Sequence, residues 1–103
     1  MTRIYAERGT NNGRCYLSVK GHATGSSQVC AAVSGLVYAL AGYLMNATGV
    51  DVRGESLESA DAVIDFFGDQ MAVGAFLCTV IGLRQIAKEY GDFVEMEYVE
   101  GKT

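Results

Sequence analysis

The sequence predicts an α+β domain in which two helices pack on a mainly antiparallel sheet of five strands. Three observations predict it: five segments with alternating polarity, two long segments with helical spacing of apolar residues, and glycine-rich or polar breaks between them. The chain order is β-β-α-β-β-α-β, and hairpins favour a sheet with both helices on one face. With 103 residues, the chain is expected to form a single domain over residues 1–103.

The strands are assigned where apolar and polar residues alternate. These segments are residues 3–8, 14–20, 50–53, 61–66 and 92–100. The dipeptide Asn12-Gly13 lies in the first break and is typical of a hairpin turn, because both residues tolerate positive φ. Residues 54–59 are expected to form the connection between the third and fourth strands.

The first helix is predicted to begin after Ser26 or Ser27, either of which can cap it, and to end near Asn46. It is apolar around much of its circumference, so we expect it to be buried on several sides. The second helix is predicted to begin at Asp69, whose carboxylate suits a helix N-terminus. Its neighbouring apolar residues are Met71, Ala75, Val80, Leu83 and Ile86.

Residues 23–50 form an uncharged run of 28 residues without Asp, Glu, Lys or Arg. A membrane span is one interpretation, but a span needs about 20 predominantly apolar residues, and here polar residues and glycines interrupt. No Lys or Arg cluster flanks the run to set an orientation. We therefore predict a buried helix and no membrane partner. The first residues lack the apolar core of a signal peptide, which favours a cytoplasmic location.

Charge and cysteine content limit the partners. Eight Lys and Arg against twelve Asp and Glu give a net charge of −4, so no basic face for nucleic acid is expected. The acidic second half could attract a basic partner, and the alternative is a solvated face that keeps a small protein soluble. The cysteines Cys15, Cys30 and Cys78 are odd in number, which favours reduced thiols. With one histidine in the chain they match no zinc pattern, so neither metal nor cofactor is expected.

One junction could carry chemistry. His22 ends the second strand and Cys30 lies in the first turn of the first helix, where the partial positive charge favours a thiolate. First-turn N–H groups could also hold an oxyanion. Gly21 allows a tight turn, and Ser34 shares the helix face of Cys30. The alternatives are a core cysteine, a surface histidine and a helix serine bonded to the preceding turn.

These residues resemble a known family. Gly21-His22-Ala23, a glycine-containing loop and then Val29-Cys30-Ala31-Ala32-Val33-Ser34 look like the signature of the ribosomal-processing cysteine protease family Prp (YsxB-like). The resemblance implies a cytoplasmic, homodimeric cysteine endopeptidase without metal or cofactor. It implies removal of an N-terminal extension from a ribosomal large-subunit protein, or trimming of a phage capsid or scaffold protein. On this likeness Cys30 matches the nucleophile, His22 the general base, and Ser34 and Gly21 their supporting neighbours.

The chain departs from the family pattern in two ways. Its loop between His22 and Cys30 is shorter, and Ser27 stands where the family has an acidic residue three positions before the cysteine. Ser27 then either substitutes as a neutral hydrogen-bonding group or marks a divergent member with another substrate. A second hypothesis follows from these departures, namely a binding module with the same fold and little or no turnover.

Overall fold

The computed structural model describes residues 1–9, 12–22, 26–58 and 61–101 and confirms the predicted order of elements. The turn residues 10–11 and residues 23–25 of the glycine-containing loop lie outside the described part, as do 59–60 and 102–103. The elements are β1 (Thr2–Arg8), β2 (Arg14–Lys20), α1 (Ser27–Asn46), β3 (Val50–Glu58), β4 (Asp61–Gly68), α2 (Gln70–Glu89) and β5 (Val94–Glu100).

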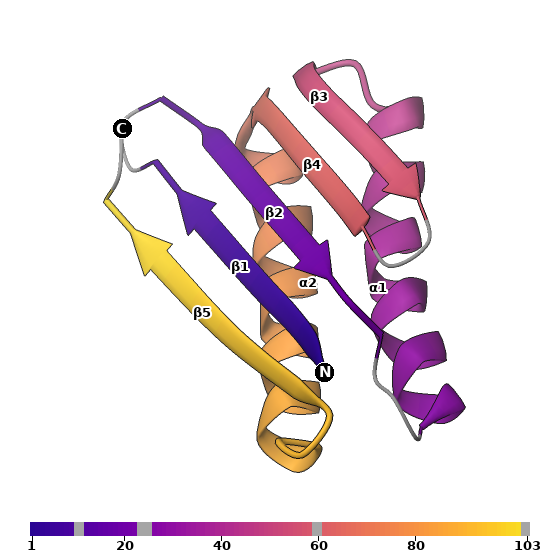
Figure 1. The fold of residues 1–103 in the computed structure, drawn as a ribbon. Coiled ribbons are helices and arrows are strands. Elements are labelled where there is room, and N and C mark those ends of the chain that lie inside the picture. Colours follow the sequence, from indigo (N-terminus) through magenta and orange to yellow (C-terminus); the bar gives the residue numbers. More distant parts are fainter. Residues whose placement is uncertain (10–11, 23–25, 59–60, 102–103) are drawn as a thin grey trace.

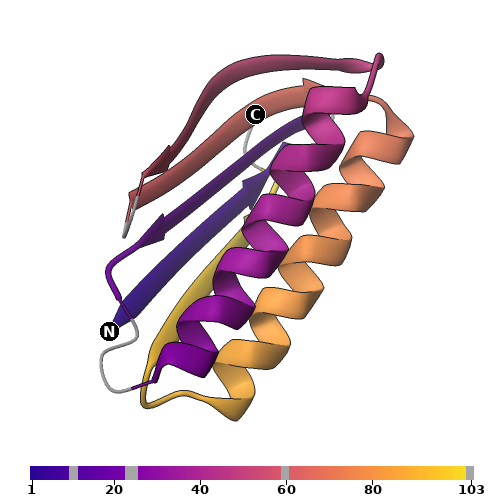
Figure 2. The ribbon, with the colours of Figure 1, turned by 90° about the vertical axis from the view of Figure 1, so that its right-hand side faces the viewer.

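The five strands form one mixed sheet in the order β3-β4-β2-β1-β5 (Figure 1). Strand β2 pairs antiparallel with β1 and β4, β3 pairs antiparallel with β4, and only β1 and β5 are parallel. Both helices cover the same face of the sheet, side by side and running in opposite directions (Figure 2). The predicted α+β class with a mainly antiparallel sheet is confirmed. The other sheet face, which carries no helix, is called the open face below.

The core lies between the helices and the sheet, because alternate strand residues point to opposite faces. Phe66 of β4 meets Phe76 of α2 edge to face, with ring centroids 6.1 Å apart. Such pairs add to the stabilisation from buried area. The fully buried side chains come from both layers: Phe66, Phe76, Leu17, Leu40, Ile64, Leu83, Val29, Val80, Val94 and Cys15.

Strand β3 is longer than the sequence predicts. Residues 54–58 were expected to belong to the connection, but β3 continues through them to Glu58. A register shift between Val52 and Gly54 accommodates the glycine, as β-bulges do near sheet edges. Strand β3 is at the edge of the sheet and has a neighbouring strand on one side only. It therefore tolerates polar residues, which weaken the alternation pattern.

The buried face of α2 is centred on Ala72, Phe76, Thr79, Val80 and Leu83, and Met71 is 71% exposed. The expectation that α1 is buried on several sides is wrong. Helix α1 is buried on one face rather than on several. Its opposite side leaves Tyr38 58% and Met45 77% exposed. Apolar composition around α1 therefore does not correspond to burial within one chain.

Both helices are long and apolar enough to cross a membrane by length and composition, and 33% of the most apolar stretch of each is buried. The core helices of soluble proteins pass the same test. Here both helices lie along an open sheet, whose edge strands would leave unpaired backbone groups in a bilayer. The architecture therefore favours core helices over membrane spans.

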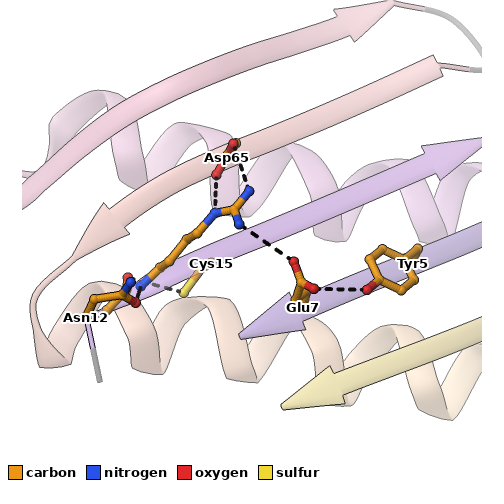
Figure 3. Close-up of polar contacts among 7 residues, drawn as sticks. Tyr5, Glu7, Asn12, Cys15 and Asp65 are labelled. Carbon is orange, nitrogen blue, oxygen red and sulfur yellow. Dashed lines mark hydrogen bonds and ion pairs between the residues drawn. The ribbon is translucent and has the colours of Figure 1, made fainter. Parts of the chain in front are cut away.

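A polar network on the open face fixes the register of three strands (Figure 3). Arg14 of β2 donates to both carboxylate oxygens of Asp65 on β4, at 3.3 and 3.4 Å, and lies 3.8 Å from Glu7 of β1. Tyr5 donates its hydroxyl to Glu7 at 3.1 Å. Bidentate contacts of this kind have defined geometry. The resulting β2–β4 register sets Lys20 opposite Asp61 at one end of the sheet.

Candidate active site

The first turn of α1 positions Cys30. Ser26 is the N-cap, and its hydroxyl accepts a hydrogen bond from the N–H of Val29 at 3.2 Å. The N–H of Cys30 donates to the carbonyl of Ser26 at 3.3 Å. Of the two predicted caps, the structure selects Ser26, and Cys30 lies in the first turn. Ser27 and Gln28 are the helical residues whose N–H groups have no partner within the helix.

Gly21 directs the chain out of β2 and into His22. Its φ is +86°, and a Cβ at this position would lie 2.6 Å from the carbonyl oxygen of Met1. Thr2 donates its hydroxyl to the carbonyl of Gly21 at 3.1 Å. Glycine adopts positive φ without strain, whereas a side chain here would be strained and would also clash. The peptide that carries the exposed His22 is therefore held by β1.

One cavity of about 320 Å³ brings the predicted residues together. Gly21, His22, Cys30 and Ser34 all line it, although they come from the end of β2 and from the first three turns of α1. Apolar side chains form much of the remaining wall, from β2, α1, β3 and β4: Val19, Val33, Val37, Leu57 and Ala62. Its size is at the lower end for ligand sites, enough for one or two residues of a peptide.

Ser27 is the one predicted site residue that does not line this cavity. It is exposed at the start of α1, one residue after the cap. The Ser27 hydroxyl therefore cannot substitute, inside the cavity, for the acidic group of the family pattern. The glycine-containing loop, including Ala23 and Gly25, lies outside the described residues.

Sequence reasoning missed three further lining residues. Tyr38 was not among the predicted site residues, but it lines the cavity and is 58% exposed. Its position two turns after Cys30 was a usable signal, because i, i+4 and i+8 share a helix face. Glu58 and Asp61 were assigned to the connection or to an exposed alternation. The β2–β4 pairing places Asp61 beside the end of β2, and the full length of β3 places Glu58 next to Asp61.

The three cysteines have different environments. Cys15 is buried in the sheet, and burial raises the pKa of its thiol to about 12, with Arg8 opposing the shift. Cys78 is exposed on α2 and is not among the residues that line the cavity. Only Cys30 lines it. Across the described residues, no group of three or more His, Cys, Asp or Glu side chains could hold a metal ion.

Comparisons with known proteins agree with this arrangement. The family model described as cysteine protease Prp matches residues 1–95. A structure of the ribosomal processing protease Prp from Staphylococcus aureus with a covalently linked product peptide superposes with a TM-score of 0.79 at 16% identity, covering 95% of this chain and 99% of that one. No match was found among curated proteins.

Two more solved structures share the fold. SMU.848 from Streptococcus mutans gives a TM-score of 0.74 at 20% identity, covering 97% of this chain and 95% of that one. The S. aureus protease with a substrate peptide gives 0.71 at 14% identity, covering 95% and 99%. At such sequence identities these structures establish the fold, while the family match establishes the class of protein. The chain belongs to the cysteine protease Prp family.

Proposed function

We propose that the chain acts as a single Prp-like domain and is a cysteine endopeptidase in which Cys30 is the nucleophile and His22 the general base. The observation that carries the proposal is the shared cavity, which both residues line at the start of a helix. A thiol needs an adjacent base or a positive environment to attack a peptide carbonyl, and this junction offers both. Gly21 supports the position of His22.

In the proposed reaction His22 takes the proton of the Cys30 thiol, and the thiolate sulfur forms a bond to the substrate carbonyl carbon. The carbonyl oxygen becomes an oxyanion, for which the N–H groups of Ser27 and Gln28 are the candidate donors, since that of Cys30 is already bonded to Ser26. His22 then protonates the leaving amine as the C–N bond breaks. Water hydrolyses the thioester and restores the thiol.

Ser34 has a supporting role in this proposal. It lies one turn after Cys30 and lines the same cavity. Its hydroxyl can therefore donate a hydrogen bond to the substrate backbone or to the Cys30 sulfur. Ser27 lies outside the cavity and contributes its backbone N–H rather than its hydroxyl.

The proposed substrate is a protein with a short N-terminal extension, either a ribosomal large-subunit protein or a phage capsid or scaffold protein. The family match supports it, and the S. aureus relative is described as a ribosomal processing protease with bound peptide. The net charge of −4 favours a basic substrate. Such a protease is expected in the cytoplasm, and we expect no nucleic acid, membrane or cofactor partner.

A homodimer belongs to the same proposal. The side chains of Tyr38, Met45, Met71 and Ile81 are between 58% and 77% exposed on the two helices. Exposed apolar surface of this kind is typical of an interface that a second copy covers. Analytical ultracentrifugation at micromolar concentration is expected to give twice the mass of the chain.

Cleavage of peptides that span candidate extensions tests the activity. Cys30→Ala is expected to lower kcat/KM by at least about 10³-fold, because it removes the attacking atom. Cys78→Ala is the matched control, since Cys78 is exposed and lies off the cavity, and it is expected to keep full activity. Cleavage that persists in Cys30→Ala would refute the assignment.

The second candidate is a peptide-binding module without turnover. The observation that favours it is Ser27, which replaces the acidic residue of the family pattern and does not reach the cavity. Mass spectrometry after prolonged incubation distinguishes the two. A module returns every bound peptide intact, whereas the protease leaves two fragments and passes through a thioester on Cys30.

A further inference from the structure

The start of β1 places a buried hydroxyl beside the candidate active site. Thr2 is 3% exposed and lines the cavity that His22 and Cys30 also line. Alternate residues of a strand point to the same face, and Ile4 and Ala6 of β1 belong to the core under the helices. The side chain of Thr2 therefore lies on the helix-covered side of the sheet, where the cavity is, and not on the open face.

The Thr2 hydroxyl holds the peptide group that joins Gly21 to His22. It donates to the carbonyl of Gly21 at 3.1 Å. Because a peptide group is planar, a fixed carbonyl at Gly21 also fixes the direction of the His22 N–H and the position of the His22 Cα. Gly21 has a φ of +86° and no side chain, so sterics alone allow this peptide group several orientations. The hydrogen bond from Thr2 selects one of them.

Thr2 is itself held firmly by its neighbours. Its N–H donates to the carbonyl of Phe93 at 2.9 Å, and it pairs with Val94 of the parallel strand β5. Threonine is β-branched, so its χ1 angle is restricted, and burial restricts it further. His22, in contrast, is exposed, so the core does not enclose it. A rigid donor on β1 thus supports an exposed residue at the end of β2.

We propose that Thr2 is a positioning residue for the general base. Its hydroxyl orients the Gly21–His22 peptide and thereby directs the His22 imidazole toward the Cys30 thiol. The inference rests on the proposed function, which assigns the base and the nucleophile to these two residues. The proton of the Thr2 hydroxyl is used in the bond to Gly21, so Thr2 acts through His22 and not on the substrate. Small errors in the placement of a reacting group lower the rate strongly.

The kinetic test compares two substitutions of Thr2 with peptides that span candidate extensions. Thr2→Val keeps the branched shape and removes the hydroxyl, so kcat is expected to fall by at least about fivefold while KM stays within about twofold. Thr2→Ser keeps the donor and should retain at least about half of the wild-type kcat.

Thr79→Val is the matched control for Thr2→Val. Thr79 is also buried, at 6% exposure, and its hydroxyl donates to the carbonyl of Ala75 at 3.0 Å, but it does not line the cavity. The same chemical change at this site should leave kcat and KM within about twofold of the wild type. Circular dichroism checks that each variant is folded.

A second measurement needs no turnover. Nitrogen-15 relaxation gives the order parameter of the His22 amide, which belongs to the peptide group that Thr2 holds. We expect about 0.85 in the wild type and in Thr2→Ser, the value of a rigid backbone, and less than about 0.6 in Thr2→Val. A wild-type value below about 0.6 would overturn the inference without any variant.

The outcomes separate this inference from the proposed function. An unchanged order parameter or an unchanged kcat in Thr2→Val would overturn the inference, as would a rise in KM alone or equal losses in Thr2→Ser and Thr2→Val. Cleavage by the wild type that Thr2→Val does not impair refutes only the inference. If the wild type cleaves no peptide while the order parameter falls in Thr2→Val, the proposed activity is refuted and the support of His22 by Thr2 stands.

Discussion

Cys15 and Cys30 lie in opposite kinds of environment. Cys15 is on a central strand with no exposed surface, and burial raises the pKa of its thiol to about 12. Cys30 is in the first turn of α1, half-buried, and lines a cavity with His22. The sequence presents the same residue type in two apolar neighbourhoods. The difference teaches that the accessibility of a cysteine depends on its place in the fold, not on the composition of the neighbouring sequence.

Alkylation with iodoacetamide is expected to show the largest contrast. At pH 8 a thiol with a pKa of about 12 is ionised in about one molecule in 10⁴, whereas free cysteine is ionised to about a quarter. Cys15 should therefore react at least about 10³-fold more slowly than free cysteine in the folded protein. Cys30 is expected to react at the free-cysteine rate or faster. Peptide mapping by mass spectrometry measures each site, and comparable rates at both cysteines would remove the contrast.

Gly21→Ala tests whether the turn before His22 is needed for the site that contains Cys30. The new Cβ would meet the Met1 carbonyl at 2.6 Å in a backbone with φ of +86°, so we expect destabilisation of about 1–3 kcal/mol. Because Gly21 leads directly into His22, peptide cleavage should fall by at least about tenfold through kcat.

Gly35→Ala is the control for Gly21→Ala. Gly35 lies inside α1, and a Cβ added there would have no neighbouring atom within 4 Å, so alanine should stabilise the helix by about 0.5–1 kcal/mol. Urea unfolding measures both variants. Equal effects of the two substitutions would show that the Gly21 turn is not needed.

Cys15→Ser tests the burial of Cys15. The Cys15 thiol donates to the Gly13 carbonyl at 3.8 Å, a distance that suits sulfur but is too long for a hydroxyl, which is also more polar than a thiol. We expect a loss of about 1–3 kcal/mol in the free energy of unfolding. Cys78→Ser, at an exposed site, should change it by less than about 0.5 kcal/mol. Thermal denaturation of the pair tests this, and a neutral Cys15→Ser would contradict the assigned burial.

The last expected effect is a decline in stability at alkaline pH. The folded pKa of Cys15 is raised above its unfolded value, so its contribution to stability is fully present below about pH 8.5 and is lost as the pH rises toward 12. Burial and a hydrogen bond to Glu100 raise the pKa of Tyr98 to about 12, with the same sign. Urea unfolding at pH 8 and pH 10 should show a shallower decline in Cys15→Ala than in the wild type.

The fold was largely predictable because local patterns agree with it. Alternation indicated the strands, Asn12-Gly13 indicated the first hairpin, and Asp69 caps α2 by accepting from the N–H of Ala72 at 2.9 Å, as predicted. The length of β3 was not predictable from alternation, because an edge strand packs on one side and carries a bulge. Burial of α1 on several sides was wrongly expected, because apolar composition around a helix does not show which face one chain covers.

The site was predictable in part. His22 and Cys30 are close in sequence, and helix-start chemistry singles them out, so Gly21, His22, Cys30 and Ser34 were found together. Glu58 and Asp61 reach the same cavity only through strand pairing over about forty residues, which no local pattern contains. Ser27 was placed in the site by the family pattern, whereas the cap at Ser26 leaves it outside the cavity.

The pairing of Lys20 with Asp61 has a consequence for folding. The two residues are separated by 41 positions, so the cavity acquires this wall only after β2 and β4 have found their register. Contacts of long sequence separation form late, because loop closure must precede them. A partly folded chain can thus contain the helix that carries Cys30 before the sheet beside it is complete. The cavity therefore depends on strand pairing between distant segments, although His22 and Cys30 are near neighbours in the sequence.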